Sequence, residues 1–371
     1  MSRLPPDLTP NAWARARARH GPVPLDLTVT NPTVCGFPYA ADLLEPLRDP
    51  ASLVYRPDPK GLASARRAIA EDYARRGIGV DPERIVLASS SSEAYGFLFK
   101  LLCDPGASVL VPAPSYPLFE HLARLEGARP ETYRLDPSHG WQPELPARAA
   151  DAAALVLVHP NNPTGSWVRE VAADETLPLI VDEVFLEFPL AANPAPSFAA
   201  RDRGLTFTLG GLSKGRGLPQ LKLSWIVVAG EATRAGAALE KLEFIADTYL
   251  SVGTPVQRAL PDILRRGIPV RDAILARCLE NRTAAAALVR SYPGIELVAP
   301  EAGWSAVFRY PNVVAEETLV LELLDRDGVA VHPGYFFDFA SDGWLVASLI
   351  VPPERFTEGL RKTFDAIARR L

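Results

Sequence analysis

The chain has 371 residues, more than the roughly 250–300 at which one hydrophobic core stops growing, so we expect about two domains. Its hydrophobic content of 48% and charged content of 22% are typical of a globular protein, and its net charge of −5 argues against a nucleic-acid partner. No apolar run approaches the roughly 18 residues of a membrane span, so we expect no membrane partner. The three cysteines are widely spaced and odd in number, which predicts free thiols in a reducing compartment and no metal site.

The N-terminal segment, residues 1–21, lacks the apolar core of a secretory signal. Its arginines and its lack of acids after Asp7 also fit a transit peptide, but a surface helix in an Arg- and Ala-rich chain is the better interpretation. We therefore expect a cytoplasmic protein.

From residue 61 onward, helix-like and strand-like segments alternate. LASARRAIAEDYARRG is amphipathic and predicts a helix, and SEAYGFLFKLL and YPLFEHLARLEG predict two more. Short apolar runs bounded by turn residues predict strands that are buried on both faces. These runs are RIVLAS, SVLVPAP, AALVLVHP, LPLIVDE, LTFTLG and LSWIVVAG. The alternation predicts an α/β fold with a largely parallel sheet covered on both sides.

The pattern changes after about residue 253. A long helical segment precedes strand-like IELVA and WSAVFRY, a helix, the strands VAVHP and WLVASLI, and a closing helix. This predicts a smaller α/β domain that the N-terminal segment completes. We therefore expect a large domain over residues 45–253 and a small domain made of residues 1–44 and 254–371.

Polar residues follow five of the predicted strands, where open α/β sheets bind their ligands. They are Ser89–Ser92, Tyr116, Asn161 with Asn162, Asp182 and Lys214. Taken singly, each has an ordinary explanation as a helix cap, a packed ring, a turn, a solvated acid or a surface lysine. Together they offer a phosphate cradle, an aromatic ring, an amide, a carboxylate and an amine.

Four segments carry a resemblance to a known family: YRPDPKG, HPNNPTG, VDEVF and the SK of GGLSK. In this order and at these separations they resemble the aspartate-aminotransferase-like, fold-type I enzymes that use pyridoxal 5'-phosphate, from about residue 26 to the C-terminus. The resemblance implies a large domain with a mostly parallel seven-stranded sheet. It also implies an aminotransferase that moves an amino group between an amino acid, or a related amine, and a 2-oxo acid by a ping-pong Schiff-base mechanism.

The resemblance assigns roles at the cofactor ring. Lys214 would form the Schiff base with the cofactor aldehyde and shuttle the proton between Cα and C4′. Asp182 would pair with the pyridinium nitrogen. Asn162 would hydrogen-bond the ring 3′-oxygen, and Tyr116 would stack on the ring.

The resemblance also assigns the phosphate contacts. Ser90, Ser91 and Ser92 would hold the phosphate at a helix N-terminus, where the dipole favours an anion. Tyr55 would reach the phosphate of a neighbouring subunit, so we expect a homodimer. Only six of the 39 basic residues are lysines, and Lys222 stands eight positions after the Schiff-base lysine, where the family has a phosphate-binding arginine. A point charge there replaces a bidentate fork.

The chain departs from the family at two positions near the ring and the phosphate. Phe185 stands where a tyrosine usually donates a hydrogen bond to the ring 3′-oxygen, which should let the aldimine keep its proton to higher pH. Gly211, three positions before the lysine, stands where a serine usually contacts the phosphate, with Ser213 close by.

A third departure concerns the substrate carboxylate. The family binds it with an arginine that aligns near Val346, and residues 327–354 contain no Arg or Lys. A buried carboxylate without a cation is costly, so either another arginine such as Arg309 substitutes, the substrate is not a standard α-amino acid, or an inserted loop shifts the alignment. The candidates for lining the pocket, which are also ordinary core residues, are Trp304, Tyr335 and Phe336.

Other functions share this scaffold. A carbon–sulfur lyase, a racemase or a decarboxylase would use the same cofactor site, because the pocket decides which bond breaks. A regulatory domain fused to DNA-binding helices would need a longer segment than the 25 or so residues before DLTVTNPT. Lys214, Asp182 and Asn162 together argue against a scaffold that has lost its cofactor.

Overall fold

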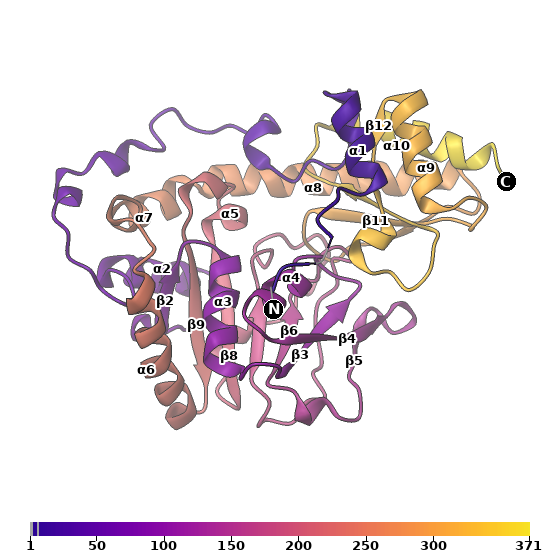
Figure 1. Ribbon diagram of the computed structural model, residues 1–371. Coiled ribbons are helices and arrows are strands. Elements are labelled where there is room, and N and C mark those ends of the chain that lie inside the picture. Colours follow the sequence, from indigo (N-terminus) through magenta and orange to yellow (C-terminus); the bar gives the residue numbers. More distant parts are fainter. Residues whose placement is uncertain (1–2, 6) are drawn as a thin grey trace.

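The computed structural model describes residues 3–5 and 7–371, and these residues form a large sheet, a smaller sheet and the helices packed on them (Figure 1). Among the described residues, the large sheet has eight strands in the order β2-β9-β8-β7-β6-β3-β4-β5. Their bounds are β2 (Ile85–Ala88), β3 (Ser108–Ala113), β4 (Arg129–Asp136), β5 (Gln142–Glu144), β6 (Ala154–Val158), β7 (Leu179–Asp182), β8 (Leu205–Gly211) and β9 (Ser224–Gly230). β9 and β5 run antiparallel to their neighbours, and the other pairs are parallel.

The predicted α/β class is confirmed, but the sheet has one strand more than the seven expected. The additional strand, β5, has three residues and pairs with β4 at the edge, so its sequence carries no readable period. The central strands β6, β7, β8 and β9 are buried along their whole length, which explains why they read as continuous apolar runs.

Helices cover both faces of the large sheet. On one face, α3 (Ser91–Leu102), α4 (Phe119–Leu125) and α6 (Ala232–Tyr249) share a core with β2, β8 and β9. On the other face, α2 (Ala63–Arg75) and α7 (Thr254–Arg266) form a second core around Trp225 and Leu87. α7 follows the expected domain boundary at residue 253 yet packs on α2. The division into two domains stays a prediction.

The smaller sheet is antiparallel and has the order β10-β11-β14-β13. Its bounds are β10 (Glu296–Val298), β11 (Ser305–Arg309), β13 (His332–Pro333) and β14 (Trp344–Ser348). Around it lie α1 (Ala12–His20), the long α8 (Ile268–Leu288), α9 (Glu316–Glu322) and α10 (Pro353–Ala368) (Figure 1). The N-terminal segment joins this part because β1 (Leu25–Asp26) pairs with β12 (Val329–Ala330).

The two sheets meet in one apolar cluster. Val346 and Val307 of the smaller sheet pack in a core with Val181 and Leu157 of the large sheet. This contact closes the C-terminal edge of the large sheet on one side. Within residues 3–5 and 7–371, no helix combines the length and the apolar character needed to cross a bilayer.

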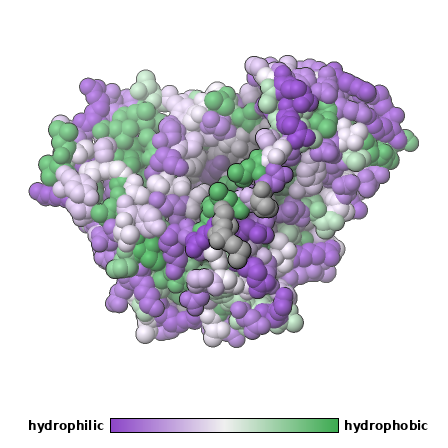
Figure 2. Space-filling model, viewed as in Figure 1, coloured by the Kyte–Doolittle hydropathy of each residue, from purple (hydrophilic) through white to green (hydrophobic). Residues whose placement is uncertain are grey.

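Figure 2 shows that one face of the molecule is hollowed near its centre and that apolar residues gather at the left of the view. Exposed apolar side chains in the segment before α2 and on α6 include Leu53, which is 89% exposed, Tyr55 at 72% and Phe244 at 77%. Single exposed apolar residues are ordinary, but a group of large ones marks a contact surface.

Candidate active site

A cavity of about 350 Å³ lies at the C-terminal edge of the large sheet, where the smaller sheet covers it. Six of the residues that the sequence indicated line this cavity together: Ser91, Ser92, Tyr116, Asn162, Asp182 and Lys214. They come from the ends of five strands or the loops that follow them, and the sheet brings them to one edge.

The amine and the carboxylate are placed by two adjacent strands. Asp182 is the last residue of β7, which pairs with β8, and Lys214 lies on α5 (Leu212–Gly215) directly after β8. The pairing of Asp182 with Leu209 fixes how far β8 extends past β7. The two side chains therefore reach the same space from neighbouring strands.

Asp182 is a buried carboxylate held by two donors. The Tyr95 hydroxyl donates to its Oδ2 at 3.2 Å, and the Val184 backbone N–H donates to its Oδ1 at 3.1 Å. Burial raises the pKa of Asp182 to about 6, while the two hydrogen bonds and the charge of Lys214 oppose that shift. A further cation at this carboxylate would favour its ionised form, as a protonated ring nitrogen does.

Lys214 is an amine without a polar partner. No described residue forms a hydrogen bond or an ion pair with its Nζ, which lies 5.0 Å from the ring centre of Trp304 and 5.5 Å from that of Phe185. Burial lowers the pKa of Lys214, and the charge of Asp182 only partly opposes this. A desolvated lysine of this kind has a larger neutral fraction and is a better nucleophile.

The two adjacent asparagines have separate tasks. Asn161 fastens its loop, because its amide donates to Thr164 Oγ1 at 2.9 Å and accepts from the Ser115 hydroxyl at 3.0 Å. Asn162 lines the cavity, and its Oδ1 accepts a hydrogen bond from the Ser305 hydroxyl at 3.2 Å. The Nδ2 donor of Asn162 is thereby left for a ligand.

The serine run starts α3 as expected. Ser90 is its N-cap, with its hydroxyl accepting from the Glu93 N–H at 3.1 Å, while Ser91 and Ser92 line the cavity. The side chain of Ser90 is thus engaged in the cap and does not line the cavity. The N-terminus of this 12-residue helix is suited to an anion.

Two other predicted phosphate contacts do not line the cavity. Lys222 is exposed and has a left-handed backbone with φ 49°. Tyr55 is exposed and lies beside Leu62 and Ser251 in a separate depression of its own chain. The roles of Ser90, Lys222 and Tyr55 stay predictions.

The substrate end contains no arginine among the described residues. Val346 of β14 lines the cavity at the position where the family has its arginine, and it pairs with His332 of β13. Arg309, one of the alternatives that the sequence left open, does not line the cavity: it is exposed and lies over the Trp344 ring at 5.7 Å, beside another hollow.

Two of the three expected pocket residues line the cavity, and so do several residues that the sequence did not indicate. Trp304 and Phe336 line the cavity, whereas Tyr335 does not. The sequence analysis did not predict that His332 and several hydroxyl residues line the cavity. The histidine at the end of the predicted strand VAVHP could have indicated a polar pocket residue, whereas no sequence pattern marks the hydroxyl residues. Burial lowers the pKa of His332 to about 4, so this imidazole is neutral at ordinary pH. The missed hydroxyl residues are Thr28, Thr30, Ser305 and Ser348.

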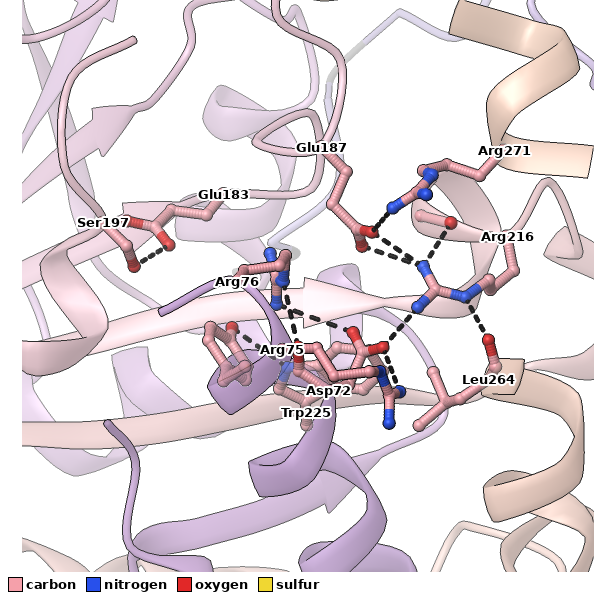
Figure 3. Close-up of polar contacts among 12 residues, drawn as sticks. Asp72, Arg75, Arg76, Glu183, Glu187, Ser197, Arg216, Trp225, Leu264 and Arg271 are labelled. Atoms are coloured by element: carbon pink, nitrogen blue, oxygen red, sulfur yellow. Dashed lines mark hydrogen bonds and ion pairs between the residues drawn. The ribbon is translucent and has the colours of Figure 1, made fainter. Parts of the chain in front are cut away.

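A buried ion network holds the segment that carries Lys214 (Figure 3). Arg216, which is 2% exposed, donates to Asp72 of α2 at 2.5 Å and to both oxygens of Glu187 at 3.0 and 2.9 Å. Arg271 of α8 donates to the same Glu187 at 3.1 Å. The network ties the lysine segment to the chain that follows Asp182 and to two helices.

The cavity thus combines a half-buried amine without a polar partner, a buried carboxylate, an amide donor and a helix N-terminus, which are the groups that a pyridoxal-phosphate site needs. Solved structures show the same fold. The alanine aminotransferase from Pyrococcus furiosus superposes with a TM-score of 0.83 at 22% identity, covering 96% of this chain and 95% of that one. The tyrosine aminotransferase from Leishmania infantum gives a TM-score of 0.82 at 24% identity, covering 93% and 92%.

The sequence comparisons identify the family. The family described as "Aminotransferase class I and II" matches residues 46–361. The glutamate-pyruvate aminotransferase AlaA of Haemophilus influenzae is 30% identical over 342 residues, which cover 85% of this chain and 84% of that protein. An alanine aminotransferase of Mycobacterium tuberculosis is 29% identical over 351 residues, covering 86% and 80%. The chain belongs to the class I and II aminotransferase family and is a pyridoxal-phosphate-dependent aminotransferase, as its motifs predicted.

Removing Arg216 should destabilise the protein strongly. Arg216→Leu leaves Asp72 and Glu187 buried with less positive charge, so we expect the free energy of unfolding in urea to fall by about 3–5 kcal/mol. Arg265→Leu is the matched control, because Arg265 forms an exposed pair with Asp262 and its loss should cost about 1 kcal/mol or less. Equal losses in the two variants would contradict the assigned role of the network.

The burial of Asp182 predicts a pH dependence of stability. Its pKa of about 6 in the folded protein lies above the ordinary 3.8, so the folded state favours the protonated acid and loses stability as the pH rises through 6. Asp182→Asn removes this loss. In the cofactor-free protein, the stability of the variant relative to the natural chain should therefore grow by about 1–1.5 kcal/mol between pH 5 and pH 8. A difference independent of pH, measured by urea unfolding, would refute the buried state of this carboxylate.

Proposed function

We propose that this cavity catalyses transfer of an amino group from an amino acid, or a related amine, to a 2-oxo acid in two successive half-reactions. The observation that carries the proposal is that the half-buried Lys214 amine and the buried Asp182 carboxylate line one cavity together with the first turn of α3. The relatives named above act, by their names, on glutamate, pyruvate or alanine, which agrees with this class of reaction.

The residues divide the work by position. When bound, pyridoxal phosphate supplies an aldehyde carbon for amines and a ring that takes up the electron pair released at the substrate Cα. Asp182 would keep a proton on the ring nitrogen, and Lys214 Nζ would take the proton from the substrate Cα and deliver it to C4′. Asn162 Nδ2 would donate to the ring oxygen, and Phe185 has no hydroxyl with which to add a second hydrogen bond. The first turn of α3 would hold the phosphate, since its dipole and its N–H groups favour an anion.

A second candidate is an amine donor that lacks an α-carboxylate. It is favoured by one observation, the replacement of the expected arginine by the apolar Val346 next to a neutral His332. A carboxylate placed there would lose water without gaining a cation, which is costly unless several hydroxyls compensate. Ser348, Ser305 and Thr28 are the described hydroxyl groups available for this.

We further propose a homodimer that works in the cytoplasm. Tyr55 lies outside the cavity of its own chain and beside exposed Leu53 and Val54, which supports contact with a second copy. The free cysteines, two of them buried, support a reducing compartment. Sedimentation equilibrium should give twice the chain mass of 40.2 kDa; a monomer would sink the dimer proposal.

The test of the proposed function is an absorbance spectrum of the protein loaded with pyridoxal phosphate. We expect an α-amino-acid or amine donor to abolish the cofactor band near neutral pH and a 2-oxo acid to restore it. The panel should contain matched pairs, each an α-amino acid and the amine that lacks its carboxylate. Recovery of the band with any 2-oxo acid supports transamination, and the better member of each pair identifies the donor class.

Lys214→Ala serves as the control, because it removes the reacting amine while leaving the cavity open. A band in the natural protein that donors bleach without any return on adding 2-oxo acids would contradict amino-group transfer. It would favour lyase, racemase or decarboxylase chemistry at the same site.

A further inference from the structure

A neighbouring side chain, and not the backbone conformation, explains why residue 211 is a glycine. It ends β8 with φ 176° and ψ 164°, an extended conformation that any residue adopts. A Cβ added to Gly211 would lie 2.4 Å from the Oγ of Ser224 and 3.2 Å from its Cβ. The side chain of Ser224 therefore occupies the space that a residue at position 211 would fill.

Ser224 is a buried hydroxyl residue without a polar partner. It begins β9, is 3% exposed, and its side chain makes no hydrogen bond with any described residue. The Ser224 oxygen is not among the fully buried side-chain atoms that lack a partner, so the hydroxyl can still reach a water molecule or a ligand. The hydroxyl is therefore available to a ligand from outside the described chain.

The strand pairing places Ser224 beside the start of α3. Ser224 pairs with Gly211 of β8 on one side and with Ala88 of β2 on the other. The chain continues from Ala88 through Ser89–Ser92 into α3, and from Gly211 to Lys214 three residues on. Ser224 therefore lies between Ala88 and Gly211 in the sheet. These are the residues after which the chain continues to the first turn of α3 and to Lys214.

The alternation of side chains places the Ser224 hydroxyl on the α3 face of the sheet. Ile226, two residues on, packs in the core that contains Phe97 of α3, whereas the intervening Trp225 packs on the opposite face with Tyr73 of α2. Side chains two apart on a strand share a face. The hydroxyl and the first turn of α3 therefore lie on the same side of the sheet and at the same end of it.

We propose that the Ser224 hydroxyl binds the cofactor phosphate. It would replace the serine that the family usually has at the position of Gly211. The donor then comes from β9 instead of β8. Lys222, two residues earlier on the same segment, is the nearest cation in sequence to this hydroxyl. The inference rests on the proposed function, since it assigns a contact at that cofactor site.

The test compares pyridoxal phosphate with pyridoxal, which has the same ring and aldehyde but no phosphate. Equilibrium dialysis of the cofactor-free protein measures the dissociation constant of each ligand without any catalytic readout. Ser224→Ala should weaken binding of pyridoxal phosphate about tenfold, the typical effect of one hydrogen bond to a charged group, and leave pyridoxal unchanged. A merely structural role would weaken both ligands equally.

The exchange of the two residues sharpens the test. Gly211→Ser alone should fold poorly, because its Cβ meets the Ser224 hydroxyl, whereas Gly211→Ser combined with Ser224→Gly removes that clash. The double variant should regain most of the tenfold loss for pyridoxal phosphate. The matched control is Ser213→Ala, a hydroxyl of the neighbouring segment, which should change the ratio of the two dissociation constants by less than about twofold.

Unchanged pyridoxal phosphate binding in Ser224→Ala, or a phosphate-specific loss in Ser213→Ala instead, would overturn the role of Ser224 while leaving the aminotransferase site intact. Absence of binding in the natural chain would overturn the proposed cofactor site and this inference together. The two failures are therefore distinguishable in one set of dialysis measurements.

Discussion

The site depends on a half-buried amine and a buried carboxylate that lie in one cavity without forming an ion pair. Lys214 and Asp182 come from adjacent strands, yet no ion pair within 4.0 Å joins them among the described residues. Burial pushes both groups toward their neutral forms, because charge is costly without a partner. A ring that brings a cation to Asp182 and an aldehyde to Lys214 satisfies both. The Arg216 network preserves the separation, since it fixes the segments that follow both residues.

The two ends of the cavity depart from the family in different ways. At the end where α3 begins, Gly211 and Ser224 are direct neighbours, and in our proposal the second supplies the hydroxyl that the first lacks. At the substrate end, Val346 has a neutral histidine beside it, and no arginine of the described chain lines the cavity. We therefore expect this protein to bind the cofactor as other family members do, but to differ from them in the substrate that it accepts.

The sequence predicted what depends on local pattern and on strand order. Asp182, Asn162 and Lys214 could be placed because each follows a buried apolar run, and the ends of parallel strands meet at one edge. It did not predict β5, which is too short to show a strand period. It also did not predict that Arg309 lies outside the cavity, because the orientation of Arg309 depends on the pairing of β11 with β14. Ser224 was missed because its significance lies in a contact across strands, which a linear motif does not display.

The most direct test of the central claim is to locate the lysine that binds the cofactor. The protein is loaded with pyridoxal phosphate, reduced with borohydride so that the carbon–nitrogen link becomes permanent, digested, and its peptides are sequenced by mass spectrometry. The account predicts the modification on Lys214 alone, because its amine is desolvated and has no polar partner. Modification of exposed Lys222 in its place, or scattered labelling of surface lysines, would contradict it.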